Sequence, residues 1–180
     1  DYKHMYNYLK DTYGDDGILE EWIVQHDEVS RLYNKSVNPV RIVTVNNGGK
    51  CNILVAGLTI GNGRDISNAS CNDLVSPIDI NTGILKFPAV DSEGQIFDRH
   101  PITNEIIEGF KIPYWEEIIK LVEEASLVVP NIKYVGWDIA VTPAGGVIIE
   151  GNTSPGYQFY QIPSHLPDGI GNREKYEKFL

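Results

Sequence analysis

The sequence predicts an α+β domain in which helices pack on an antiparallel sheet. Two glycine-containing loops, residues 48–49 and 143–146, each join two apolar runs of strand length, which is the pattern of β-hairpins. One segment, residues 113–129, carries apolar residues at helical spacing. The order of these elements, with strands before the helix and a hairpin after it, favours an antiparallel-rich α+β fold.

Length and composition limit the class of protein. At 180 residues, with 42% hydrophobic and 10% aromatic residues, the chain can bury the core of one ordinary domain. A formal net charge of −10 argues against nucleic acid as a partner, because its phosphates would be repelled. No apolar run approaches the length of a membrane span. Cys51 and Cys71 lack the spacing of metal ligands, which fits a reducing cytoplasm, and we expect the protein there.

The first half of the chain is predicted to form strands separated by turns. The expected strands span residues 17–25, 40–47 and 51–61. Between the first two, residues 26–36 indicate a short helix or loop, and Pro39 opens the second strand. Residues 62–73 are mostly Gly, Asn, Ser and Asp, so we predict a loop long enough to bind a ligand or to be disordered.

The second half contains the predicted helix and the second hairpin. Before them, residues 78–101 indicate a hairpin-rich excursion with turns at 81–83 and 91–94. Pro113 suits the first position of the helix, and Pro130 ends it. The apolar stripe of this helix consists of Trp115, Ile118, Ile119, Val122 and Ala125.

The hairpin over residues 136–152 is predicted to bring three oxygen-bearing side chains together. If it turns about Ala144, Asp138 lies opposite Glu150, since both are six residues from that centre. Alternation along the strand then points Asn152 the same way as Glu150. Two carboxylates and an amide oxygen suit Mg²⁺, and the lack of nearby His or Cys argues against zinc. A lone Asp at a strand end is more often a turn cap, so the prediction of a metal site depends on all three residues together.

The remaining features carry weaker signals. The segment from Tyr157 onward is aromatic, Pro-rich and irregular, with a short helix expected near residues 173–180. The four histidines have neither metal-ligand nor catalytic-triad spacing, so we expect surface or core positions for them; they are His4, His26, His100 and His165.

Three segments resemble the ATP-grasp superfamily. An Asp on one strand, followed by Glu-x-Asn at the end of its hairpin partner, is similar to the magnesium signature of that superfamily, and "EGNTSPG" resembles its D-alanine ligase-like members. The segments "SVNPVRIVTV", "IPYWEEIIKLVEEA" and "YVGWDIAVTPAGGVIIEGNTSPG" together resemble the sugar-transfer-associated ATP-grasp family. The similarity covers about residues 17–161. It implies an ATP-grasp C-terminal subdomain that acts in cell-surface polysaccharide synthesis.

The resemblance implies a role for several residues in binding ATP and Mg²⁺. Glu20 would accept a hydrogen bond from the adenine amino group, and the backbone from Glu21 through Trp22 to Ile23 would read the edge of the ring. Arg41 would face the phosphates, although a structural salt bridge is an open alternative for an Arg in an apolar strand. Further positions implied by the resemblance are Asn68 for the cofactor, Asp138, Glu150 and Asn152 for the metal, and Ser154 and Gly156 for the acceptor.

The implied domain organisation has three parts. Residues 1–16 would be the tail of a preceding ATP-grasp subdomain or a linker, residues 17–161 the nucleotide- and metal-binding domain, and residues 162–180 a C-terminal tail. The preceding subdomain would supply a glycine-rich lid and a lysine. Since the chain begins without Met, we expect a longer natural chain to precede it.

The sequence also departs from the family pattern at three places. Thr59 stands where relatives commonly have Arg, Asn72 and Asp73 replace two glycines, and Asn104 replaces another. An acid where the backbone would approach a phosphate is unfavourable by repulsion. Two functions therefore stay open: a ligase that joins an unknown carboxylate to an amine, and a non-catalytic nucleotide-binding or assembly domain. A plain structural domain is a third hypothesis, which treats the three-residue set as accidental.

Overall fold

An antiparallel sheet organises the fold in the computed structural model, which describes residues 1–14, 20–65, 72–166 and 168–179. Seven strands of the described chain form one sheet in the order β5-β4-β3-β2-β1-β6-β7. The strands are β1 (Val40–Asn47), β2 (Lys50–Ile60), β3 (Leu74–Pro77), β4 (Ala89–Val90), β5 (Ile96–Phe97), β6 (Tyr134–Thr142) and β7 (Gly145–Asn152). Every neighbouring pair is antiparallel, which confirms the predicted α+β class.

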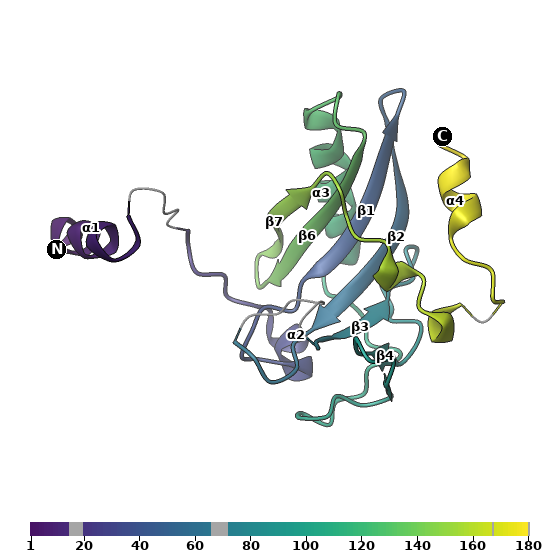
Figure 1. Ribbon diagram of the computed structural model, residues 1–180, viewed down its shortest axis with the longest axis horizontal. Coiled ribbons are helices and arrows are strands. Elements are labelled where there is room, and N and C mark those ends of the chain that lie inside the picture. The colour runs from purple at the N-terminus through teal and green to yellow at the C-terminus, as the bar shows by residue number, and fades with distance from the viewer. Residues whose placement is uncertain (15–19, 66–71, 167, 180) are drawn as a thin grey trace.

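Helices α2 (Asp27–Leu32) and α3 (Trp115–Val128) cover one face of the sheet, and the C-terminal segment covers the other (Figure 1). The helices are α1 (Tyr2–Tyr13), α2 (Asp27–Leu32), α3 (Trp115–Val128) and α4 (Arg173–Glu177), with short 3₁₀ helices η2 (Gln158–Tyr160) and η3 (Pro163–His165). On the helix-covered face, Ile118 and Val122 of α3 pack with Val40 and Ile42 of β1. On the opposite face, which we call the tail-covered face, Tyr176 packs over Val43 and its neighbours.

The two predicted hairpins are present. The β1–β2 turn places Gly48 and Gly49 at φ 62° and 80°, a conformation that glycine adopts without steric cost. The turn between β6 and β7 consists of Pro143 and Ala144, because Thr142 pairs with Gly145. Both loops therefore act as the sequence predicts.

The predicted strand over residues 17–25 is wrong for the part that the structure describes. Residues 20–26 belong to no helix or strand, and Glu20, Glu21 and Trp22 are exposed. One backbone bond, from His26 N to Val141 O, ties the end of this segment to β6. Its apolar residues line a surface cavity instead of a sheet, so an alternating pattern here reflects partial cover and not strand pairing.

The helix prediction holds with a shifted start. α3 begins at Trp115 behind a left-handed Tyr114 cap, so Pro113 precedes the helix and is not its first residue. None of the described helices is long and apolar enough to cross a membrane.

Candidate functional site

A row of directly paired residues crosses five strands at one level of the sheet. From β3 to β7 the row reads Pro77, Gly57, Arg41, Asp138 and Glu150. Residues that pair directly across antiparallel strands point to the same face. The row therefore puts one cation and two acids side by side on the tail-covered face.

A β-bulge in β7 produces the pairing of Asp138 with Glu150. Next to the turn, Ile139 pairs with Ile148, which would leave Asp138 opposite Ile149. The register shifts at this point, so Ile149 is the extra residue and Glu150 faces Asp138. The predicted pairing of Asp138 with Glu150 is confirmed. The turn is centred between Pro143 and Ala144 and not on Ala144, and the extra residue of the bulge restores the predicted pairing.

Arg41 holds Asp138 with two parallel hydrogen bonds. Arg41 Nε donates to Asp138 Oδ1 at 2.5 Å, and Nη2 donates to Oδ2 at 2.6 Å. The Arg41 side chain is 26% exposed and that of Asp138 is 12% exposed, so both charges are largely withdrawn from water. The sequence left a structural ion pair open as an alternative role for Arg41, and this ion pair is present. It compensates the negative charge of Asp138 but not that of Glu150.

The ionisation of this group follows from burial and from its neighbours. Burial raises the pKa of Asp138. The hydrogen bonds and charge of Arg41 act to lower this pKa, and the contact with Glu150 raises it further. The pKa of Glu150 is lowered, first because its carboxylate accepts a hydrogen bond from Asn152, and further by its contact with Asp138 and by the charge of Arg41. Burial alone would lower the pKa of Arg41, but the bonds and charge of Asp138 more than offset it, and the pKa is raised. The site therefore concentrates negative charge that a further cation would stabilise.

Asn152 completes the set of oxygen atoms. Its Nδ2 donates to Glu150 Oε1 at 2.9 Å, which leaves its amide oxygen as the remaining polar atom of the side chain. Two carboxylates and an amide oxygen fit the donor preference of Mg²⁺. The described residues contain no group of three or more His, Cys, Asp or Glu that could hold a metal, so any Mg²⁺ here must take its remaining ligands from water or substrate.

The segment that the resemblance places against adenine lines a cavity next to this site. Trp22 and Ile23 line a cavity of about 500 Å³, closed on its other sides by residues 34–37 and by Ile149. Its volume lies in the range of ~300–1,000 Å³ typical of small-molecule sites. Ile149 is the bulge residue, so this cavity begins one residue from the acidic pair. Glu20 and Glu21 are exposed beside it, and Asn68 lies outside the described residues.

The segment implied to bind an acceptor leaves the sheet directly after β7. Ser154 and Gly156 are exposed, whereas Pro155 between them is buried. A side chain at Gly136 of β6 would come within 2.5 Å of Pro155, so glycine is needed there for the segment to pack on the sheet. The two exposed positions are thereby held beside the acidic pair.

Sequence reasoning did not single out Tyr160, which contacts Arg41 from the C-terminal segment. Burial raises the pKa of its hydroxyl to about 12, although Arg41 opposes the shift. His165 was assigned to the surface or core, and it is buried with Nε2 2.9 Å from Pro88 O. The aromatic content of the tail was the signal that could have identified both residues.

The departures from the family pattern have a conformational explanation. Asn72 and Asn104, which stand where glycines are usual, have φ of 70° and 61°. Asn is among the non-glycine residues that adopt this left-handed region most readily, so the backbone shape is kept. Asp73 is fully buried and accepts from Asn62 N at 2.9 Å, so its carboxylate fixes the loop from within. The expected repulsion between Asp73 and a phosphate stays a prediction.

Comparison with known proteins gives one match. A family model described as sugar-transfer associated ATP-grasp matches residues 6–175. No curated protein and no solved structure matches the chain.

Proposed function

The chain belongs to the sugar-transfer associated ATP-grasp family, and from this premise we propose that it uses Mg²⁺-ATP to join a carboxylate to an amine. Family membership implies ATP binding and ligase-like chemistry that depends on ATP. The carboxylate–amine reaction, its place in cell-surface polysaccharide synthesis and a cytoplasmic location are our proposals. The observation that carries the reaction is the row of Arg41, Asp138 and Glu150, with Asn152 bonded to Glu150.

The proposed reaction has two steps. A carboxylate oxygen of the acceptor bonds to the γ-phosphorus as the bond from that phosphorus to ADP breaks, which gives an acyl phosphate. The amine nitrogen then bonds to the acyl carbon, phosphate leaves with the former carboxylate oxygen, and the amine loses a proton. Positioning and charge neutralisation carry such phosphoryl transfer, and the protein need not form a covalent bond to substrate.

The residues of the row supply charge and positioning for this reaction. Asp138, Glu150 and the amide oxygen of Asn152 would hold Mg²⁺, which when bound neutralises phosphate charge. Arg41 keeps its guanidinium beside the same oxygens, where it orients Asp138 and adds positive charge. Ser154 and Gly156, exposed on the segment after β7, would position the acceptor.

The cavity next to Ile149 is the proposed adenine site. The backbone N–H and C=O groups of a segment that is not paired in a sheet can serve as donor and acceptor for a base edge, and Glu21–Ile23 lie in a segment that belongs to no helix or strand. Glu20 would accept from the adenine amino group. The apolar side chains of Ile23 and Ile149 supply a surface for the ring, and the phosphates would then extend toward Glu150.

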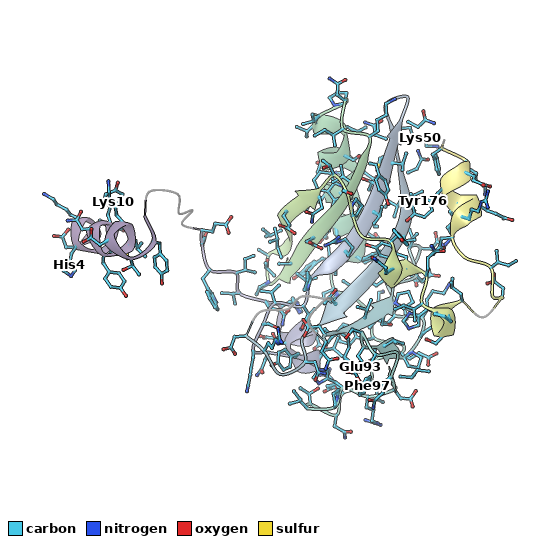
Figure 2. The ribbon with its side chains drawn as sticks, in the orientation of Figure 1. His4, Lys10, Lys50, Glu93, Phe97 and Tyr176 are labelled. Atoms are coloured by element: carbon cyan, nitrogen blue, oxygen red, sulfur yellow. The ribbon has the colours of Figure 1, made fainter. Side chains whose placement is uncertain are left out.

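Substitution of Glu150 tests the proposal most directly. Because Glu150 is exposed, Glu150→Gln should leave the melting temperature nearly unchanged and weaken Mg²⁺-dependent ATP binding by at least about tenfold. Calorimetric titration of ATP, with Mg²⁺ and again with a chelator, measures this. Glu93→Gln is the matched control, since this exposed acid precedes β5, at the opposite edge of the sheet from β7 (Figure 2). Equal ATP affinity in wild type, Glu150→Gln and Asp138→Asn would contradict the proposal.

A non-catalytic nucleotide-binding domain is the second candidate, and one observation favours it. Both oxygens of Asp138 already accept from Arg41, as expected if the pair has become purely structural. Phosphate release from ATP separates the candidates. A ligase should release phosphate when an amino acid or amino sugar from a test panel is added. Mg²⁺-dependent ATP binding without stimulated release by any panel member would support the binding domain.

A further inference from the structure

A second cavity lies under the C-terminal segment, on the same face as the acidic pair. It has a volume of about 220 Å³ and is lined by residues of β2, β3, the segment after β3 and the tail, where Tyr160 and Lys175 are the first and last lining residues. His165 closes one side, because its ring stacks on Phe87 at 5.7 Å between centroids and its Nε2 lies 2.9 Å from Pro88 O. These contacts fix the tail over the sheet, so the cavity is built by packing of separate parts of the chain.

The row of paired residues connects this cavity to the proposed reaction site. Gly57 and Pro77 line the cavity, and Gly57 pairs directly with Arg41. Since glycine has no side chain, nothing from Gly57 stands between the cavity and the Arg41 guanidinium. Neighbouring strands are about 4.8 Å apart, so Gly57 and Asp138 are separated by roughly 10 Å, which one small molecule can span.

Tyr160 marks the other connection. Its ring lines the cavity, and its hydroxyl contacts Arg41. A molecule in the cavity would therefore contact the same tyrosine that touches the charged row.

The lining combines an apolar floor with several polar side chains. Val55 and Val75 form part of the floor, whereas Asn81, Asn172 and Asp79 lie among the lining residues with polar side chains. A sugar ring has apolar C–H faces and hydroxyl groups around its edge, which this arrangement matches. In addition, Nδ1 of the lining residue His165 is buried and has no hydrogen-bond partner among the described residues, a group that a ligand hydroxyl or water could satisfy.

Charge and size restrict the ligand further. Lys86 and Lys175 both line the cavity, while Asp79 is its one lining acid and lies 3.8 Å from Lys86. This excess of positive charge occurs in a chain of net charge −10, so the cavity favours an anion. A volume of about 220 Å³ is below the ~300–1,000 Å³ of sites for drug-sized ligands, which leaves room for a single ring.

We propose that this cavity binds the acceptor of the reaction and that the acceptor is a sugar acid, a monosaccharide whose carboxylate points along the row toward Arg41. The inference rests on the proposed function, because it assigns the carboxylate that ATP would activate. It identifies Gly57, Tyr160 and Lys175 as the residues that select this substrate.

Calorimetric titration with glucuronate, glucose and glutamate tests the inference on the 180-residue chain. Glucuronate should bind, and glucose and glutamate should each bind at least about tenfold more weakly, since each lacks either the carboxylate or the ring. Gly57→Val should reduce glucuronate affinity at least tenfold by filling the floor, with Mg²⁺-ATP affinity unchanged. Gly57→Ala checks the fold, because a Cβ there would make only an ordinary 3.4 Å contact with Ser76 O.

Two lysine variants provide a second test of the inference. Lys175→Met should weaken glucuronate binding severalfold, whereas Lys50→Met, at the exposed β1–β2 turn, should not change it (Figure 2). No glucuronate binding to a chain that binds Mg²⁺-ATP would overturn the inference and leave the proposed function standing. Equal binding of glutamate, or glucuronate binding that neither Gly57→Val nor Lys175→Met reduces, would also overturn it. Glucuronate binding that depends on Gly57, without Mg²⁺-ATP binding, would support the cavity and reject the proposed function.

Discussion

Asp138 and Glu150 carry similar chemical groups in different surroundings, so their substitutions should differ. As a whole residue Asp138 is 9% exposed, and its carboxylate accepts hydrogen bonds from Arg41. Removing the charge of Asp138 would leave the partly buried Arg41 without its partner, which lowers the stability of the fold. Glu150 is exposed and bonded to Asn152. Asp138→Asn should destabilise the domain by releasing Arg41, which makes Glu150→Gln the cleaner probe of metal binding.

Asn104 offers a test of left-handed backbone at a single residue. It is exposed at φ 61°, and its N–H donates to His100 O at 2.8 Å. Asn104→Gly should therefore leave the free energy of unfolding within about 0.5 kcal/mol of wild type. Asn104→Val should lower it by about 1–2 kcal/mol, because a β-branched residue is strained in this region. Urea unfolding measures both, and a Val variant as stable as the Gly variant would contradict this account.

His100 should make stability depend on pH. Its ring is buried, with Nε2 2.8 Å from Gly61 O, while Nδ1 accepts from Thr103 N at 3.2 Å. Burial lowers its pKa, although the Gly61 carbonyl and the charge of Asp73 oppose this. The ring is therefore held neutral, with its proton on Nε2, which donates to the Gly61 carbonyl oxygen.

The sign of the pH effect follows from proton binding. Below the unfolded pKa of about 6.5 the unfolded chain binds a proton that the folded chain does not, so stability falls as pH falls through 6.5. His165, whose pKa burial also lowers, contributes in the same direction. Thermal unfolding at pH 7.5 and 5.5 should show this loss, and His100→Gln should reduce the difference between the two pH values. An identical difference in wild type and His100→Gln would count against His100.

At the scale of elements, α3 and the β6–β7 hairpin depend on each other. A Cβ on Gly146 would lie 2.8 Å from Ile118 Cγ1, so glycine lets the helix approach β7 closely. The sequence identifies Gly146 only as part of a turn. Its second role, at a helix–strand contact, fixes α3 over the hairpin that carries Glu150.

The N-terminal helix α1 contributes little to the stability of the sheet domain. It has no buried residue, and Figure 1 shows it apart from the sheet, with Tyr2 88% and Tyr13 71% exposed. Deleting residues 1–14 should change the melting temperature by no more than about 2 °C, because no apolar surface is uncovered. Differential scanning calorimetry measures this. A fall of more than about 5 °C would show that α1 packs on the domain.

At the scale of the whole molecule, the C-terminal segment covers the face that carries the candidate site. Tyr176 of α4 lies on the side of the helix facing the sheet (Figure 2) and packs over Val43, Leu54 and Val55. Tyr176→Ala should lower the free energy of unfolding by about 2 kcal/mol, somewhat less than full burial of an aromatic ring would give. Tyr157→Ala is the control, since Tyr157 is 62% exposed, and should cost under about 0.5 kcal/mol. Equal unfolding midpoints for the two variants in urea would mean that α4 does not hold the tail.

The sequence alone determined the local elements and the family. Tight glycine turns and apolar periodicity are local signals, so they predicted both hairpins and a helix over residues 113–129, which the structure places at Trp115–Val128. The spacing of Asp138, Glu150 and Asn152 depends on one hairpin and was readable for the same reason. Similarity over most of the chain gave the ATP-grasp family.

Only the tertiary structure decided which distant residues meet. The partner of Arg41 depends on β1 lying between β2 and β6, and no turn signal encodes the bulge at Ile149. The cavity beside Gly57 exists because the tail folds back over β2 and β3. Strand order, bulges and the path of a tail are settled by many weak contacts between segments far apart in the chain, and periodicity within one segment carries no record of those contacts.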